Sequence, residues 1–140
     1  MNKHIFLAMV SYVVLTMIVA YPWHMIWFHD VYVAMGAVTR PEPIVPFGMS
    51  AMVLQGWVIA YLYPFYYYFK GGTPIASGVK FSLLMGLMVY TVMVLANVAK
   101  FQIEPIGQYL AYGSIFQLIQ YVVTGAALGL IYGRLARNPE

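Results

Sequence analysis

Four long apolar stretches divide the sequence, and short polar segments separate them. The stretches cover residues 5–28, 44–69, 81–99 and 109–132, and none of them contains Asp, Glu, Lys or Arg. A hydrocarbon core about 30 Å thick takes roughly 20 helical residues at 1.5 Å each. Because the stretches are continuously apolar, without the alternation of a barrel strand, the pattern predicts four membrane-spanning helices. The expected fold is an all-α four-helix membrane bundle, with residues 1–140 as a single transmembrane domain.

Composition agrees with this pattern and narrows the possible functions. Hydrophobic residues make up 63% of the 140 residues and charged residues 8%, whereas soluble domains carry about 25% charged residues. This balance argues against a soluble enzyme, a disordered chain and a nucleic-acid-binding module. Since there is no cysteine, disulfides, thiol nucleophiles and thiolate metal sites are excluded. Membrane lipids, and not nucleic acid, are the expected surroundings, and bound lipid is expected.

The positions of the positive charges predict the orientation of the bundle. One side carries five Lys and Arg residues and the other side carries two, and the cytoplasmic side of a membrane protein holds the excess. Both termini are therefore predicted to be cytoplasmic in a multi-pass protein of the cell membrane, here the bacterial cytoplasmic membrane. A cleaved signal peptide is the alternative for residues 5–28, but Pro22 just after the candidate cleavage site argues against it. The five cations are Lys3, Lys70, Lys80, Arg134 and Arg137, and the two are Arg40 and Lys100.

Aromatic residues gather at the ends of the predicted spans. Amphipathic rings prefer the boundary between headgroups and hydrocarbon, so most of these residues are interpreted as interfacial anchors. A shelf for a quinone or a lipid is the alternative interpretation. The residues are Trp23, Trp27 and Phe28 at one boundary and Tyr61, Tyr63, Phe65, Tyr66, Tyr67, Tyr68, Phe69 and Tyr132 at the other.

Small residues recur every four positions in two of the spans. Positions four apart drift by only about 40° around a helix, so each series forms a shallow groove in which another helix can approach closely. We favour packing within the bundle, and a docking face for another subunit is the alternative. One series is Gly78, Ser82 and Gly86, and the other is Gly125, Gly129 and Gly133.

A few polar side chains lie within the spans, and a buried amide in hydrocarbon needs a partner. Gln117, Gln120 and Thr124 share a sector of roughly 60° with Gly113, while Gln55 and Asn97 lie on other spans. The main interpretation is that these groups hold helices together. A polar path for a small neutral solute is the alternative, although no intramembrane carboxylate is present to bind a proton or cation.

The segment that follows Pro22 holds the one candidate for metal chemistry. His24, His29 and Asp30 lie close in sequence, and imidazole with carboxylate suits zinc or, with a thioether, copper. Five residues of continuous helix would put the two histidines roughly 140° apart, so an unwound helix end is needed for both to bind one metal ion. Haem ligation through either histidine is a weaker alternative. If these histidines bind neither a metal ion nor haem, we expect them to form hydrogen bonds with headgroups, water or a backbone carbonyl.

Catalytic patterns are missing: no Gly-x-Ser-x-Gly turn occurs, and no span holds paired carboxylates. The order of features instead resembles small bacterial four-span membrane proteins of unknown function. The residues that carry this resemblance are residues 24–32, Arg40-Pro41-Glu42, Gly78-Val79-Lys80-Phe81 and Tyr132-Gly133-Arg134. The resemblance implies the four-span bundle and no particular activity.

The expected function is that of a non-catalytic accessory, assembly or stabilising subunit. It would dock laterally in a larger membrane complex or on copies of itself. A metal- or cofactor-binding protein at His24, His29 and Asp30 is the first alternative. A small-solute channel or transporter along Gln55, Asn97, Gln117 and Gln120 is the second.

Overall fold

The computed structural model describes residues 3–38, 40 and 42–135, and every regular element among them is a helix. Two short π-helices, η1 and η2, interrupt the first and third spans. The elements are α1 (Lys3–Tyr21), η1 (Pro22–Trp27), α2 (His29–Ala34), α3 (Val45–Lys70), α4 (Pro74–Tyr90), η2 (Thr91–Leu95), α5 (Ala96–Lys100) and α6 (Ile106–Leu135).

Four helical segments are long and apolar enough to cross a membrane, which confirms the predicted all-α fold with four spans. They are Lys3–Trp27, Val45–Lys70, Pro74–Lys100 and Ile106–Arg134, with 25, 26, 27 and 29 residues. At 1.5 Å per residue each exceeds the hydrocarbon thickness of about 30 Å. The chain is therefore described as a multi-pass membrane protein.

The third span begins earlier than its apolar run indicates, at Pro74 instead of residue 81. Gly71 ends α3 with a φ of 62°, which glycine adopts without a steric penalty. Thr73 is extended, and Pro74 then occupies the first helical position, where its missing N–H costs nothing. Lys80, predicted to be in a loop, lies on α4 with an exposed side chain.

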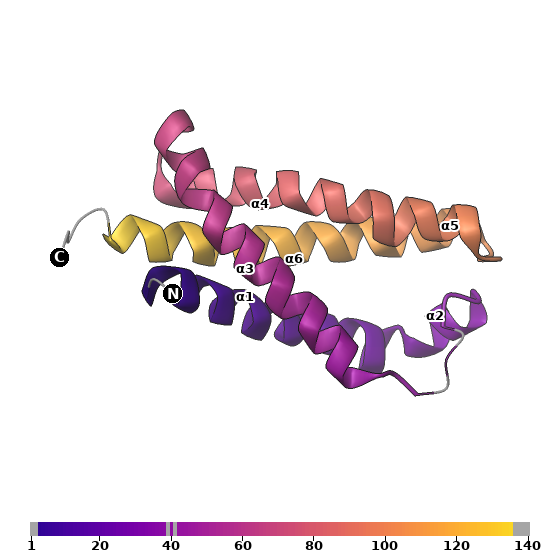
Figure 1. Ribbon diagram of the computed structural model, residues 1–140. Coiled ribbons are helices and arrows are strands. Elements are labelled where there is room, and N and C mark those ends of the chain that lie inside the picture. The colour runs from indigo at the N-terminus through magenta and orange to yellow at the C-terminus, as the bar shows by residue number, and fades with distance from the viewer. Residues whose placement is uncertain (1–2, 39, 41, 136–140) are drawn as a thin grey trace.

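Helices α1, α6 and α4 lie side by side with α6 in the middle, and α3 crosses them obliquely (Figure 1). Helix α3 contacts α1 and α4. Helix α1 begins and α6 ends at the same end of the bundle, while α2 and α5 lie at the opposite end (Figure 1). This antiparallel order is the one that four consecutive spans with short loops produce.

Two aromatic-rich cores fill the two halves of the bundle. The first includes Tyr12, Tyr63 and Tyr121, and the second includes Trp23 and Tyr32. Tyr63 has no exposed surface, so the interpretation of this residue as an interfacial anchor is wrong. Its hydroxyl donates a hydrogen bond to the Pro74 carbonyl oxygen at 3.0 Å. The ring is inside because α3 crosses α4 there, which a count of aromatic residues could not reveal.

Candidate functional site

The two series of small residues face each other along the contact between α4 and α6. A Cβ atom on Gly125 would lie 2.7 Å from the Gly78 carbonyl oxygen and 2.8 Å from Ser82 Cβ. A Cβ on Gly86 would lie 2.5 Å from the Tyr121 ring of α6. Such distances leave no room for a side chain, so the backbones touch. This contact joins two helices of the same chain, in agreement with the interpretation that these small residues pack within the bundle.

The remaining two glycines of α6 extend this close contact to the start of α4. A Cβ on Gly129 would collide with the Pro74 carbonyl oxygen, and one on Gly133 would lie 2.6 Å from Pro74 Cβ. The docking-face alternative needs these surfaces to be open, and here they are covered by the chain itself. Any lateral partner therefore has to use a different face.

Tyr12 of α1 lies at the centre of a buried polar network in the middle of the bundle. Its hydroxyl donates a hydrogen bond to Gln55 Oε1 of α3 at 3.1 Å and accepts one from Gln120 Nε2 of α6 at 3.4 Å. Gln120 Nε2 also reaches Thr16 Oγ1 at 3.5 Å, and Thr124 Oγ1 donates to the Gln120 carbonyl oxygen at 2.8 Å. Two of the predicted intramembrane polar residues, Gln55 and Gln120, thus connect α3 and α6 to α1, whereas Thr124 bonds only to its own helix.

A cavity of about 260 Å³ lies toward the end of the bundle that holds α2 and α5. We call it the His24 cavity. Both π-helices contribute to its wall, η1 through His24 and Met25 and η2 through Met93 and Val94. π-Helical turns occur frequently at functional sites. The other lining residues include Tyr32, Asn97, Tyr109, Phe116 and Gln117.

One backbone carbonyl group of η2 accepts hydrogen bonds from side chains of α5 and α6. The Met93 oxygen accepts hydrogen bonds from Tyr109 Oη at 3.1 Å and from Asn97 Nδ2 at 2.7 Å. A bulged helix has backbone groups that the regular ladder does not satisfy, and these two side chains supply donors. Asn97 therefore serves as a local brace at the cavity wall.

His24 packs among aromatic rings. Its ring centroid lies 4.5 Å from that of Phe116 and 5.0 Å from that of Tyr32. His29, by contrast, begins α2 and contacts Asp30 through Nδ1 and Oδ1 at 3.3 Å, with the His29 side chain half-buried and the Asp30 side chain fully exposed. Among the described residues, no group of three or more His, Asp and Glu side chains is placed to hold a metal ion. The helix break at Phe28, with a φ of −124°, separates the two histidines into different elements and does not gather the predicted ligands.

Tyr32 supplies a hydroxyl at the same cavity. It accepts a hydrogen bond from Trp23 Nε1 at 3.1 Å. Burial raises the pKa of the Tyr32 phenol, so the group remains protonated near neutral pH. Its own proton is thus available for donation.

Gln117 has a polar atom that the folded chain leaves unsatisfied. Its Oε1 atom is buried and accepts no hydrogen bond within the part of the chain that the structure describes. The side chain borders the His24 cavity and also a shallower cavity between α4 and α6. An acceptor in this state costs about 1–3 kcal/mol. A donor bound in the cavity would recover this cost if the amide group of Gln117 turned toward it.

The predicted polar residues therefore separate into two places. Gln55, Gln120 and Thr124 belong to the network around Tyr12, while Asn97 and Gln117 line the His24 cavity. Sequence reasoning missed Tyr12, Thr16, Tyr32, Tyr109 and Phe116 as their partners. The four-residue spacing of Tyr12 and Thr16, both polar residues within a span, is the one signal that could have identified the network.

Comparison of the chain with protein-family models, with curated proteins and with solved structures finds no match.

Proposed function

We propose that the chain is a non-catalytic membrane protein that binds a small uncharged molecule in the His24 cavity. The molecule has an apolar, ring-sized body and at least one hydrogen-bond donor. The observation that carries the proposal is the side chain of Gln117, which lines this cavity and whose buried Oε1 atom has no donor within the described chain. Of the residues in the metal- or cofactor-binding hypothesis, His24 remains part of the proposed binding site. His29 and Asp30 do not, and residues of α6 such as Phe116 and Gln117 take their place.

The size and lining of the cavity define the class of molecule. An engineered apolar cavity of about 150 Å³ holds benzene, and the His24 cavity, at about 260 Å³, is larger. Phe116 and Tyr32 offer ring faces, and Gln117 offers an acceptor. Among the described residues, no acid lines the cavity, so a cation would lack a counter-charge. A phenol-like molecule matches this combination of apolar surface and acceptor.

Fluorinated probes test the proposal directly. In lipid nanodiscs, 4-fluorophenol is expected to bind the wild-type protein about tenfold more tightly than the Gln117→Met variant, because the variant lacks the hydrogen-bond acceptor. A tenfold difference in affinity corresponds to about 1.4 kcal/mol of binding free energy. Fluorobenzene, which has no donor, is expected to bind both proteins equally. Fluorine NMR with subtraction of empty nanodiscs measures both affinities.

The matched control is Gln102→Met, because Gln102 lies in an exposed loop and does not line the cavity. It should bind 4-fluorophenol as the wild type does. Equal binding of 4-fluorophenol to the wild type and to Gln117→Met would contradict the proposal. The Gln117→Met variant should also be at least as stable as the wild type, since it removes an unsatisfied buried acceptor.

Lateral docking as an accessory subunit is a second candidate function, favoured by the open face of α6. Helix α6 is central in the bundle, yet Ile115, Leu118, Ile119, Val122 and Val123 are exposed along it. A transmembrane helix of a larger complex, or a second copy of the chain, would cover this face. Mild extraction followed by native mass analysis should show a co-purifying chain, and Ile119→Trp should reduce it. A monomer in every mild detergent would refute the docking hypothesis.

A further inference from the structure

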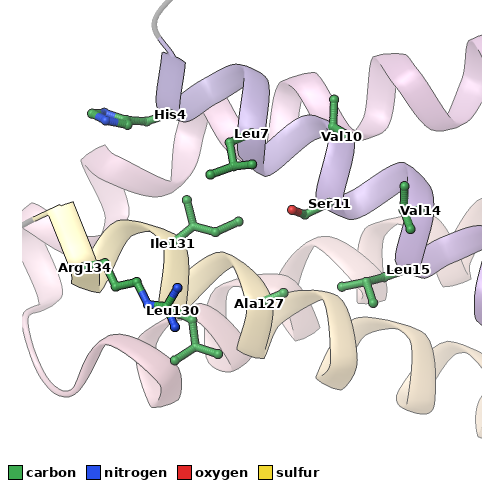
Figure 2. Close-up of a pocket in the computed structure, with 10 residues that line it drawn as sticks. All are labelled: His4, Leu7, Val10, Ser11, Val14, Leu15, Ala127, Leu130, Ile131 and Arg134. Atoms are coloured by element: carbon green, nitrogen blue, oxygen red, sulfur yellow. The ribbon is translucent and has the colours of Figure 1, made fainter.

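A long apolar groove runs between α1 and α6 in the half of the bundle where α1 begins and α6 ends. Its volume is about 600 Å³. Figure 2 shows aliphatic side chains of both helices along the groove, with His4 of α1 and Arg134 of α6 at the same end. We call it the α1–α6 groove. Its aliphatic lining includes Leu7, Val14, Leu15, Ala127 and Ile131.

The length of the groove matches one leaflet of a membrane. Its lining on α1 extends from His4 to Leu15, a rise of about 16 Å at 1.5 Å per residue. Half of a hydrocarbon core about 30 Å thick is about 15 Å. With Arg134 in the last turn of α6, the groove runs from the headgroup level to near the middle of the bilayer. An acyl chain has the shape and polarity that this space accepts.

Arg134 supplies the charge at the headgroup end. No acid of the described residues lines the groove, and the one ion pair within them joins His29 and Asp30 at the opposite end of the bundle. Arg134 also borders a second cavity of about 270 Å³ on the other side of α6, beside Thr73 and Ile75 of the α4 side. Arg134 therefore borders two apolar spaces, which matches a lipid with one phosphate and two acyl chains.

We propose that the α1–α6 groove binds an anionic phospholipid of the surrounding leaflet, with the lipid phosphate on Arg134 and an acyl chain along the groove. Arginine binds phosphate through a planar fork of donors, and basic pockets between spanning helices bind anionic headgroups. The site is separate from the His24 cavity and does not depend on the function proposed for it.

Lipid titration of delipidated protein, followed by native mass spectrometry, tests the headgroup. Phosphatidylglycerol is expected to bind the wild type at least fivefold more tightly than phosphatidylcholine with the same acyl chains. Arg134→Gln should bring this ratio to about one, and Arg134→Lys should keep part of it. Lys100→Gln, which removes a cation at the opposite end of the bundle, should leave the ratio unchanged. An unchanged ratio in Arg134→Gln, or no preference in the wild type, would overturn the proposal.

The acyl chain is tested by filling the groove while Arg134 stays in place. Ala127→Phe puts a ring into the α6 wall and is expected to weaken phosphatidylglycerol binding at least fivefold, with thermal unfolding as the check that the bundle stays folded. If Ala127→Phe does not fold, Leu7→Trp probes the opposite wall in the same way. Glycerol phosphate, which lacks acyl chains, should not compete with the lipid. Competition by glycerol phosphate, or full lipid binding in a folded groove-filled variant, would contradict a lipid site.

Discussion

Alanine in place of Gly78 or Gly129 is expected to lower the free energy of unfolding of the bundle by about 3 kcal/mol, at the upper end of typical overpacking penalties. The added methyl group would collide with the Gly125 carbonyl oxygen in the first case and with the Pro74 carbonyl oxygen in the second. Backbone atoms cannot move aside as a flexible side chain does. Helices α4 and α6 would have to separate, which also removes the dispersion contacts between them.

The measurement is reversible unfolding in mixed micelles of a mild detergent and sodium dodecyl sulfate. Gly48→Ala and Gly107→Ala are the matched controls, because a Cβ at either position meets no atom of the described residues within 4 Å. Both lie in helices, where alanine is favoured over glycine by up to about 1 kcal/mol. If all four variants had the same stability, the close contact between α4 and α6 would not exist in the folded protein.

Tyr12→Phe is expected to cost about 1–2 kcal/mol, the second-largest effect. The ring can stay in place, but Gln55 Oε1 loses its donor and Gln120 Nε2 loses an acceptor. Hydrogen bonds between membrane helices contribute about 0.6 kcal/mol on average and up to about 1.7. The variant loses two hydrogen bonds to amide groups in a buried site, so its energetic cost should lie near the upper end of this range.

Tyr21→Phe on the same helix provides the control, since its ring is 55% exposed and its hydroxyl makes no hydrogen bond with any described residue. Its stability should remain within about 0.5 kcal/mol of the wild type, as is usual for surface positions. A double variant of Tyr12→Phe with Gln55→Leu should cost less than the sum of the two single changes, because both remove the same hydrogen bond. Full additivity would mean that the Tyr12–Gln55 hydrogen bond contributes nothing.

The spans could be predicted because their signal is local: a run of apolar residues needs only its own length to be identified. The start of α4 was missed for the same reason. Residues 74–80 include Lys80 and are less apolar, and their helix is set by the turn at Gly71 and by Pro74. Likewise, the spacing of Gly78 and Gly125 indicated packing faces, but which face meets which is a property of the assembled bundle.

The candidate site was predictable only in part, because its residues come from distant segments. His24 and Gln117 were both identified as polar residues in unusual places, yet 93 positions separate them in the sequence. Proximity in sequence favoured His29 and Asp30 as partners of His24. The break at Phe28 places them on α2, and the partners of His24 are the rings of Tyr32 and Phe116. The second π-helix, η2, contains no proline, so no local signal in the sequence indicated it.

The central place of α6 has a consequence for the order in which the bundle can form during synthesis. Ribosomes deliver the spans from the N-terminus, so α1, α3 and α4 enter the membrane before the helix that lies between α1 and α4 (Figure 1). Until α6 arrives, Thr16 has no Gln120 to contact, and the glycine face of α4 has no backbone to meet. Helices α1 and α3 can already form their mutual contact, including the Tyr12–Gln55 hydrogen bond, but α4 lacks its main partner until the last span completes the bundle. A chain halted before residue 106 should remain inserted but turn over quickly, whereas one halted beyond residue 135 should persist.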